Sequence, residues 1–315
     1  MIQFFSIGEM VIDFLPGDEP GVYIRKAGGA PANVAIALAR QGIASGFLGM
    51  VGEDDFGRFL HKTLEENGVR VLCPARTREA TTTMAFVTLD EQGDRSFTFA
   101  RKPGADMLLT KAHVRDAFFD EAIVVHAGSC SLSKGTAAEA TAYALREGRR
   151  RNKLVSFDVN YRNLLWDDDR EAAARAVREI LPCVDLLKIS QEEADMIGGE
   201  EALPATMRQN DVALVVETLG ADGARCFWKD ERIELPGLRA DCVDTTGAGD
   251  AFWGGFLASL LDAGVRTAGD LTRRSIENAL RTGNIAGWLC VQKKGAIESL
   301  PTKAEVSAHF QEFYT

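Results

Sequence analysis

The sequence predicts an α/β fold with a mostly parallel central β-sheet and a second, smaller β-sheet beside it. Short apolar runs alternate with longer helical segments along most of the 315 residues. Alternation of this kind is typical of a parallel sheet whose faces are covered by helices. Two segments, 9–25 and 81–101, break the alternation and vary with a period of two. That period indicates strands with one face in water, so we expect a small antiparallel sheet there.

The strands of the central sheet are expected where the apolar runs are continuous, because a strand covered on both faces needs no polar side. These runs lie at 4–7, 45–50, 123–127, 154–158, 186–189, 213–218 and 224–228. Residues with helical spacing predict the helices that connect and follow the strands. The helical segments lie at 32–41, 55–67, 134–150, 170–181, 192–197, 248–265, 276–290 and 303–313.

The chain shows no repeats and no linker-like stretch, which predicts one unit over 1–315. The smaller sheet would come from insertions at about 9–26 and 81–103, the second of them turning near Asp94. The pattern leaves open whether these insertions cover a site as a lid or extend an edge of the main sheet.

Charge and composition exclude several classes of function. The chain has 36 Lys and Arg residues against 46 Asp and Glu residues, a net charge of −10. This balance argues against nucleic acid and anionic membranes as partners, because both repel negative charge. No uncharged apolar run approaches the roughly 20 residues of a membrane span, and no basic leader precedes Glu9 and Asp13. Six scattered cysteines without a CxxC pair favour free thiols in a reducing cytoplasm over a zinc site.

The segment DTTGAGDAFWGG at 244–255 carries the sharpest chemical signal. Gly247 and Gly249 allow tight or left-handed backbone before an apolar helix. The first N–H groups of that helix are unpaired and lie at the positive end of its dipole, which suits a phosphoryl group. Asp250 stands in the first turn, where a carboxylate can accept a proton from a hydroxyl. The alternative role for Asp250 is stabilisation of the helix dipole.

A second glycine turn leads into a helix in the segment AGGAPANVA at 27–35. Small residues allow close approach of a ligand to the backbone, and Asn33 can both donate to and accept from a sugar hydroxyl. Asp13, on a strand-like segment, can accept hydroxyl protons. The alternatives are helix capping for Asn33 and an exposed edge position for Asp13.

The two segments together, AGGAPANVA at 27–35 and DTTGAGDAFWGGF at 244–256, resemble the two signatures of the ribokinase-like (PfkB) carbohydrate kinase family. The resemblance covers nearly the whole chain. It implies a three-layer α/β/α fold with a small β-sheet lid, and transfer of the ATP γ-phosphate to a sugar hydroxyl. The strings GEMVIDFLP at 8–16 and VGEDDFG at 51–57 are most similar to the fructokinase branch.

The resemblance also implies a role for individual residues. Asp250 matches the catalytic base of the family. The residues that match its anion hole are Gly247, Ala248 and Gly249. The residues matching sugar ligands are Asp13, Gly29, Asn33, Arg101 and Arg162. The residues matching ATP ligands are Lys188, Thr218, Gly220, Ala221, Gly223, Thr246 and Asn284.

Metal sites and a subunit contact follow from the same resemblance. Glu193 matches the acid that orders water around Mg²⁺, although Ser190 stands where many relatives have Asn. The positions matching a monovalent cation site, for an ion such as K⁺, are Asp244, Thr246, Cys290, Lys293, Gly295 and Ser299. In several relatives the lid pairs two subunits, which implies a homodimer.

Other functions stay open at this point. Arg101 and Arg162 could clamp a carboxylate, which would suit 2-keto-3-deoxygluconate or a related keto-acid sugar instead of fructose. A non-catalytic carbohydrate-binding protein would not need the base at Asp250. A P-loop kinase and a nicotinamide-dependent oxidoreductase each lack their glycine-rich fingerprint.

Overall fold

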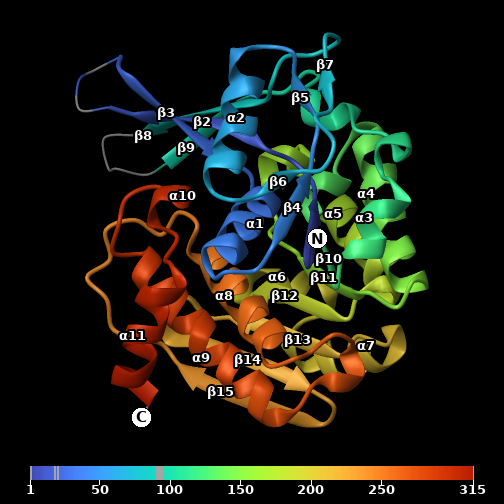
Figure 1. Ribbon diagram of the computed structural model, residues 1–315, viewed down its shortest axis with the longest axis vertical. Helices are drawn as coiled ribbons and strands as arrows, with labels where there is room; N and C mark the ends of the chain where they lie inside the picture. The colour runs from blue at the N-terminus through green and yellow to red at the C-terminus, as the bar shows by residue number, and fades with distance from the viewer. Residues whose placement is uncertain (1, 18, 20, 90–94, 315) are drawn as a thin grey trace.

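A nine-stranded sheet forms the centre of the computed structural model, which describes residues 2–17, 19, 21–89 and 95–314. The strands follow the order β15-β14-β13-β12-β11-β10-β1-β4-β6, and Figure 1 shows the sheet running through the molecule. The bounds are β1 Phe4–Ile7, β4 Ser45–Leu48, β6 Arg70–Val71, β10 Val124–Gly128, β11 Leu154–Asp158, β12 Leu186–Ser190, β13 Leu214–Thr218, β14 Gly223–Trp228 and β15 Glu231–Pro236. Among the described strands of this sheet, the pairs β13–β14 and β14–β15 are antiparallel and the other pairs are parallel, so the sheet is mostly parallel, as predicted.

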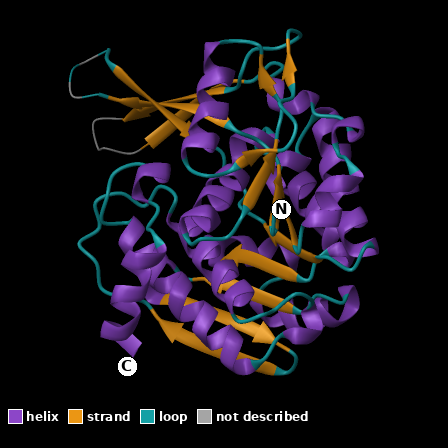
Figure 2. Ribbon diagram, viewed as in Figure 1, coloured by secondary structure: helices purple, strands orange, loops and turns teal. Residues whose placement is uncertain are grey.

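Helices cover both faces of this sheet (Figure 2). Their bounds are α1 Ala30–Arg40, α2 Asp55–Glu66, α3 Asp116–Glu121, α4 Gly135–Arg150, α5 Arg170–Ile180, α6 Gln191–Ala194, α7 Leu203–Asn210, α8 Ala248–Asp262, α9 Arg273–Cys290, α10 Ala296–Ser299 and α11 Lys303–Tyr314. The apolar residues of α1, α8 and α9 pack with one face of the strands, and those of α3, α4, α5 and α7 with the other. The result is the three-layer α/β/α arrangement expected from the family resemblance.

The smaller sheet has the order β3-β2-β8-β9, with β2 at Val11–Pro16, β3 at Tyr23–Gly28, β8 at Met84–Leu89 and β9 at Arg95–Ala100. It projects from the body of the molecule beside α2 and α10 (Figure 1). The prediction of an antiparallel sheet is wrong in one respect, because β2 and β8 pair in parallel and make the sheet mixed. The two hairpins β2–β3 and β8–β9 are joined through these strands. The predicted turn at Asp94 lies outside the described residues.

All seven predicted central strands are present, with ends that differ by at most two residues. Two edge strands of the central sheet were not predicted: β15, most of whose residues are exposed, and the two-residue β6. The two-stranded parallel pair of β5 at Val51–Gly52 and β7 at Arg76–Thr77 was not predicted either. No helix in the described part of the chain is long and apolar enough to cross a membrane. The six cysteines, all of them described, are free thiols.

Candidate active site

A cavity of about 460 Å³ lies where the lid meets the carboxyl ends of the central strands. In open parallel sheets this edge is where ligands bind. Its walls include residues of β2, the start of α1, the loop after β11, β12 and the start of α8. The polar residues that line it are Glu9, Asp13, Asn33, Asn160, Arg162, Asn163, Lys188, Thr245, Thr246 and Asp250.

The start of α8 forms one wall of this cavity. Gly247 precedes the helix with φ +80°, a left-handed conformation that a side chain would strain. The Ala248 N–H donates to Thr245 O at 3.1 Å, so this group of the predicted anion hole is already occupied. The N–H groups of Gly249 and Asp250 have no acceptor among the described residues. They leave two unpaired donors and the positive end of the helix dipole at the cavity.

Asp250 lies in the first turn of α8 and is partly accessible from the cavity. Asn33 Nδ2 donates to Asp250 Oδ2 at 2.8 Å. Burial raises the pKa of the Asp250 carboxyl, while the Asn33 hydrogen bond and the charges of Lys188 and Arg162 oppose that rise. A carboxylate in this position can accept a proton from a hydroxyl placed in the cavity.

A buried ion pair lies directly below the start of α8. Lys188 Nζ donates to Asp158 Oδ2 at 2.8 Å, and both side chains are buried. An ideal Cβ built on Gly249 would lie 3.4 Å from Lys188 Nζ, so the ammonium sits against the unpaired N–H groups. Burial raises the pKa of Asp158 to about 6 against the opposing charge of Lys188. Lys188 is predicted as an ATP ligand, and in the structure it lines this first cavity.

Asp13 enters the cavity from β2, in the lid. Its carboxylate lies directly over Gly28, where an added Cβ would come within 2.0 Å of Oδ2. The second glycine of the AGGAPANVA segment, Gly29, lines the same wall. No described group donates a hydrogen bond to the Asp13 carboxylate, and burial raises its pKa to about 6. Asp13 is therefore an unsatisfied acceptor directed at the cavity.

The two arginines predicted to contact substrate lie in different places. Arg162 lines the cavity, and its positive charge opposes the pKa rise of both Asp13 and Asp250. Arg101 is buried in an ion pair, with Nη2 donating to Asp106 Oδ2 at 2.6 Å and Nη1 donating to Ser133 Oγ at 3.2 Å. Arg101 is not among the described residues that line the cavity. The structure thus brings one predicted arginine to the cavity wall and places the other behind it.

A second cavity, of about 740 Å³, adjoins the first and shares Thr245 and Gly249 with it. Most of the predicted ATP ligands line it: Thr218, Gly220, Ala221, Gly223 and Asn284. Thr246 lines the first cavity instead. Phe252 and Trp288 add apolar surface for a flat ring. The two cavities therefore meet at the start of α8.

The region of the predicted Mg²⁺ site is acidic. Both oxygens of Glu193 accept backbone hydrogen bonds, Oε1 from Tyr161 N at 2.6 Å and Oε2 from Ser190 N at 2.8 Å. Asp158 Oδ1 is buried and has no hydrogen-bond partner among the described residues. In the described part of the chain no cluster of three or more His, Cys, Asp or Glu side chains can hold a metal directly. These residues fit a hydrated Mg²⁺ held through its waters and the nucleotide, since the ion usually keeps several waters.

The residues matching the monovalent cation site come together in the loop before α8. Asp244 Oδ2 accepts from Gly295 N at 3.0 Å, and Asp244 Oδ1 accepts from Thr246 N at 3.0 Å. Cys290 Sγ lies 2.9 Å from Ser299 Oγ and 3.7 Å from Thr246 O. Lys293 is held there through its backbone, while its side chain pairs with Glu305 at the surface. The loop that shapes the start of α8 is therefore fastened to residues 290–299.

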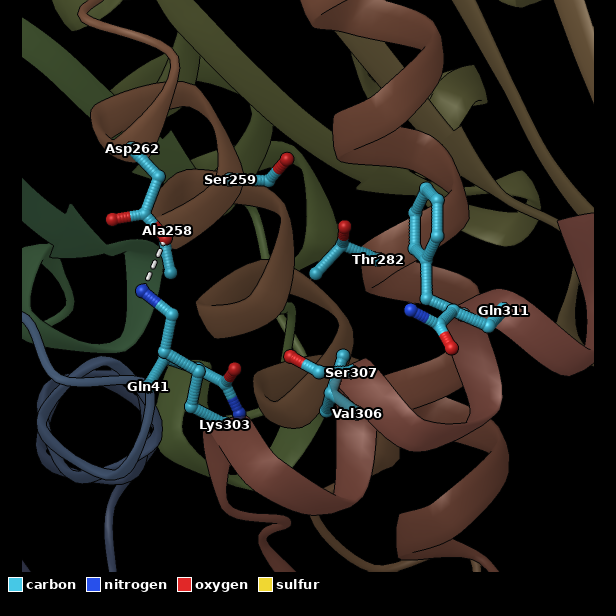
Figure 3. Close-up of a pocket in the computed structure, with 10 residues that line it drawn as sticks. Gln41, Ala258, Ser259, Asp262, Thr282, Lys303, Val306, Ser307 and Gln311 are labelled. Atoms are coloured by element: carbon cyan, nitrogen blue, oxygen red, sulfur yellow. Dashed lines mark hydrogen bonds and ion pairs between the residues drawn. The ribbon is translucent and has the colours of Figure 1, made fainter. Parts of the chain in front are cut away.

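A third cavity, of about 290 Å³, lies away from these residues, between α8, α9 and α11. Figure 3 shows its lining, with the Lys303 ammonium 2.6 Å from Asp262 Oδ2. None of the predicted site residues lines it.

Two acids were not predicted: Glu9, which lines the main cavity, and Asp158, which is buried and paired with Lys188. Asp158 ends a predicted strand next to the one that carries Lys188, and neighbouring parallel strands end at the same edge. The common edge of neighbouring parallel strands therefore predicts that the side chains of Asp158 and Lys188 lie close together. Glu9 is buried and accepts from Ser131 Oγ at 2.5 Å, and burial raises its pKa to about 7. No sequence signal brings residues 9 and 131 together.

Comparisons with known proteins agree with this geometry. Residues 1–303 match the model of the pfkB family carbohydrate kinase. The chain is 38% identical over 312 residues to fructokinase-1 of Oryza sativa subsp. japonica, covering 96% of this chain and 95% of the relative. A crystal structure of fructokinase with bound ATP from Xylella fastidiosa matches with a TM-score of 0.90 and 35% identity, over 98% of both chains.

Fructokinase from Vibrio cholerae O395, crystallised with fructose, ADP and a calcium ion, matches with a TM-score of 0.87 and 33% identity over 98% of both chains. A double mutant of that enzyme with fructose, ADP and a potassium ion matches with a TM-score of 0.86 and 32% identity, again over 98% of both chains. The Xylella structure thus contains ATP, and the two Vibrio structures contain ADP with a calcium or a potassium ion.

Proposed function

The chain belongs to the pfkB family of carbohydrate kinases, and on that premise we propose that it transfers the γ-phosphate of ATP to a primary hydroxyl of fructose. The observation that carries the proposal is the hydrogen-bonded pair Asn33–Asp250 at the start of α8, where the two cavities meet. A sugar hydroxyl in one cavity and a phosphate chain in the other would approach each other at this point. We further propose that 1–315 acts as one kinase unit with the smaller sheet as its lid.

The protein supplies a base, an anion hole and a positive charge at the point of transfer. Asn33 holds the Asp250 carboxylate in one orientation, from which it can take the proton of the attacking hydroxyl. The N–H groups of Gly249 and Asp250, with the Lys188 ammonium beside them, stabilise the negative charge of the transferring phosphoryl group. Asp13 accepts from a second sugar hydroxyl and fixes the ring. Phosphoryl transfer depends on this kind of alignment and charge stabilisation more than on covalent chemistry.

ATP is proposed to bind in the cavity lined by Thr218, Gly220, Ala221, Gly223 and Asn284. When bound, Mg²⁺ neutralises phosphate charge, and Glu193 and Asp158 are the acids beside the transfer point that would hold its waters. Closure of the lid over the sugar would exclude water, which otherwise competes for the phosphoryl group. A monovalent cation near Asp244 and Thr246 would stabilise the loop that leads into α8.

The charges of the main cavity favour a neutral ketose over a keto-acid sugar. Glu9, Asp13 and Asp250 line the cavity, and the ammonium of Lys188 is already paired with Asp158. Arg162 is then the one guanidinium among the described lining residues, because Arg101 is bound to Asp106. A substrate carboxylate would therefore meet three acids and a single unpaired cation.

A substrate panel tests the proposal. The purified protein is given ATP, Mg²⁺ and equal concentrations of fructose, 2-keto-3-deoxygluconate or ribose, and ADP release is measured together with the phosphorylated sugar. We expect the highest kcat/KM with fructose. Turnover of 2-keto-3-deoxygluconate without turnover of fructose would replace the proposed substrate.

The lid also supports a proposed homodimer. β3 is an edge strand of the lid sheet, and its apolar residues Tyr23 and Ile24 are 42% and 47% exposed, next to Val22 at 48%. Adjacent exposed apolar side chains on an unpaired edge mark a surface that gains free energy by pairing. A second copy of the lid is the proposed partner.

A further inference from the structure

A row of polar side chains crosses the face of the central sheet that packs against α1 and α8, next to the buried Asp158–Lys188 pair on the same face. Ser6, His126 and Ser156 are paired in register on β1, β10 and β11, and all three are buried. On the same face, two residues earlier along each strand, are the apolar side chains of Phe4, Val124 and Leu154. A hydroxyl or imidazole in such surroundings is costly unless it is hydrogen-bonded, so the partners of this row matter.

Two members of the row bond to the helices that carry Asn33 and Asp250. Ser6 Oγ donates to Pro31 O at 2.8 Å, in the first turn of α1. Ser156 Oγ accepts from Trp253 Nε1 at 3.0 Å, one turn into α8. The two helices are thus each attached to the sheet by a directional bond close to their amino ends.

His126 completes the arrangement at Ser156. Its Nδ1 lies 3.0 Å from Ser156 Oγ. Burial, assisted by the charge of Lys188, lowers the pKa of His126 to about 3, so the ring is neutral near pH 7. A neutral ring with the proton on Nε2 accepts at Nδ1 from the Ser156 hydroxyl, whose oxygen accepts from the indole. The Ser156 hydroxyl on β11 therefore donates to His126 on β10 and accepts from Trp253 on α8, and in this way it joins the three elements.

The attachment acts close to the proposed base. Trp253 follows Asp250 by three residues, which is about 4.5 Å along the helix axis. Direct contacts between α1 and α8 include the Asn33–Asp250 hydrogen bond and close packing of small side chains, as at Gly254, where an added Cβ would come within 2.3 Å of Ala37 Cβ. Packing of that kind fixes the separation of two helices but resists sliding weakly. The indole hydrogen bond opposes sliding and rotation of α8 about its own axis.

We propose that Ser156 is a positioning residue for phosphoryl transfer: through Trp253 it fixes the axial position of α8, and so places the Asp250 carboxylate and the N–H groups of the anion hole. This inference rests on the proposed role of Asp250. A small displacement of a reacting group lowers the rate of transfer with little effect on the binding of either substrate.

Steady-state kinetics of Ser156→Ala and Trp253→Phe test the role, with ATP and whichever sugar of the panel the wild type phosphorylates. We expect kcat to fall by about tenfold or more in each variant, with both KM values within about twofold of wild type. Both variants remove the same hydrogen bond, so the double variant should be little slower than the slower single variant. Ser156→Ala is the smaller change, and it carries the test if Trp253→Phe does not fold.

Ser45→Ala is the matched control. Ser45 is also a buried serine on a central strand, donating to Ile43 O at 3.0 Å, and it bonds to neither α1 nor α8 among the described residues. We expect Ser45→Ala to lower the Tm without changing kcat. Wild-type kcat in folded Ser156→Ala, or an equal loss of kcat in Ser45→Ala, overturns the positioning role. Asp250→Asn is assayed in parallel: if it keeps full turnover the proposed function fails, and if it alone is inactive only the positioning role fails.

Discussion

Asn33 and Asp250 are 217 residues apart in the sequence, and a hydrogen bond of 2.8 Å joins them. Each lies in the first turns of a helix that begins after a glycine, α1 after Gly29 and α8 after Gly247. The amide donates to the carboxylate, and this hydrogen bond lowers the pKa of Asp250 against the larger opposing effect of burial.

Replacement of Asp250 by Asn removes the proposed base and keeps the shape of the side chain. We expect kcat to fall by about 10²–10⁴, the usual contribution of a positioned general base. The Tm should not fall, because burial disfavours a charged Asp250 and the asparagine side chain is neutral. Coupled measurement of ADP release and thermal unfolding checks both. Turnover near the wild-type rate would remove Asp250 from the mechanism.

Replacement of Asn33 by Ala should change the pH dependence of the reaction. The Asn33 hydrogen bond lowers the pKa of Asp250, so its loss raises that pKa further. A base must be ionised to act, and activity is lost as the pH falls through its pKa. The acidic limb of the kcat/KM profile should therefore move to higher pH in Asn33→Ala. An unmoved limb would show that another group controls it.

Replacement of Lys188 by Met leaves Asp158 buried without its cation. Breaking a buried ion pair from one side costs about 3–5 kcal/mol of unfolding free energy. The double variant Lys188→Met with Asp158→Asn should recover part of this loss, because the uncompensated charge is gone. If the Lys188 ammonium stabilises the transferring phosphoryl group, the single and the double variant should both have a much lower kcat than the wild type. Denaturant unfolding and kinetics separate the two effects, and full activity in the double variant would contradict the role of Lys188.

Replacement of Asp13 by Asn should stabilise the protein while abolishing its sugar specificity. Burial raises the pKa of Asp13 from 3.8 to about 6 in the folded state. An acid with a raised pKa destabilises the fold above pH 6, and this effect disappears as the pH falls toward 3.8. The Tm of Asp13→Asn should thus exceed that of the wild type at pH 8 by more than at pH 5. A difference in Tm that does not depend on pH would rule out an ionised Asp13 as the cause.

Replacement of Ile24 by Lys places a charge on the exposed edge of the lid sheet. Charged side chains on edge strands oppose pairing with another chain. We expect the variant to sediment as a monomer at concentrations where the wild type is a dimer. Phe313→Lys is a matched control, because Phe313 is also exposed and apolar but lies on α11, far along the chain from the lid. A monomeric wild type would refute the proposed dimer, whatever the variants do.

The central sheet was predictable because its strands are buried on both faces and so appear as continuous apolar runs. β15 escaped detection because it lies at the edge, where most of its residues face water. The parallel pairing of β2 with β8 was also missed, because an alternating pattern identifies a strand's two faces but not its partner or its direction. Of the predicted sugar ligands, Asp13, Gly29, Asn33 and Arg162 line the cavity, whereas Arg101 is bound by Asp106 five residues away.

The sequence by itself determined the order of strands and helices, the glycine that starts α8 and the acid that follows it, because those depend on local backbone conformation and on the period of apolar residues. The tertiary structure decided which side chains meet. It paired Asn33 with Asp250 and Lys188 with Asp158, and it attached α8 to the sheet through Ser156. These contacts join residues that no short-range pattern connects, and each depends on the depth and angle at which a helix packs on the sheet, which the whole core sets together.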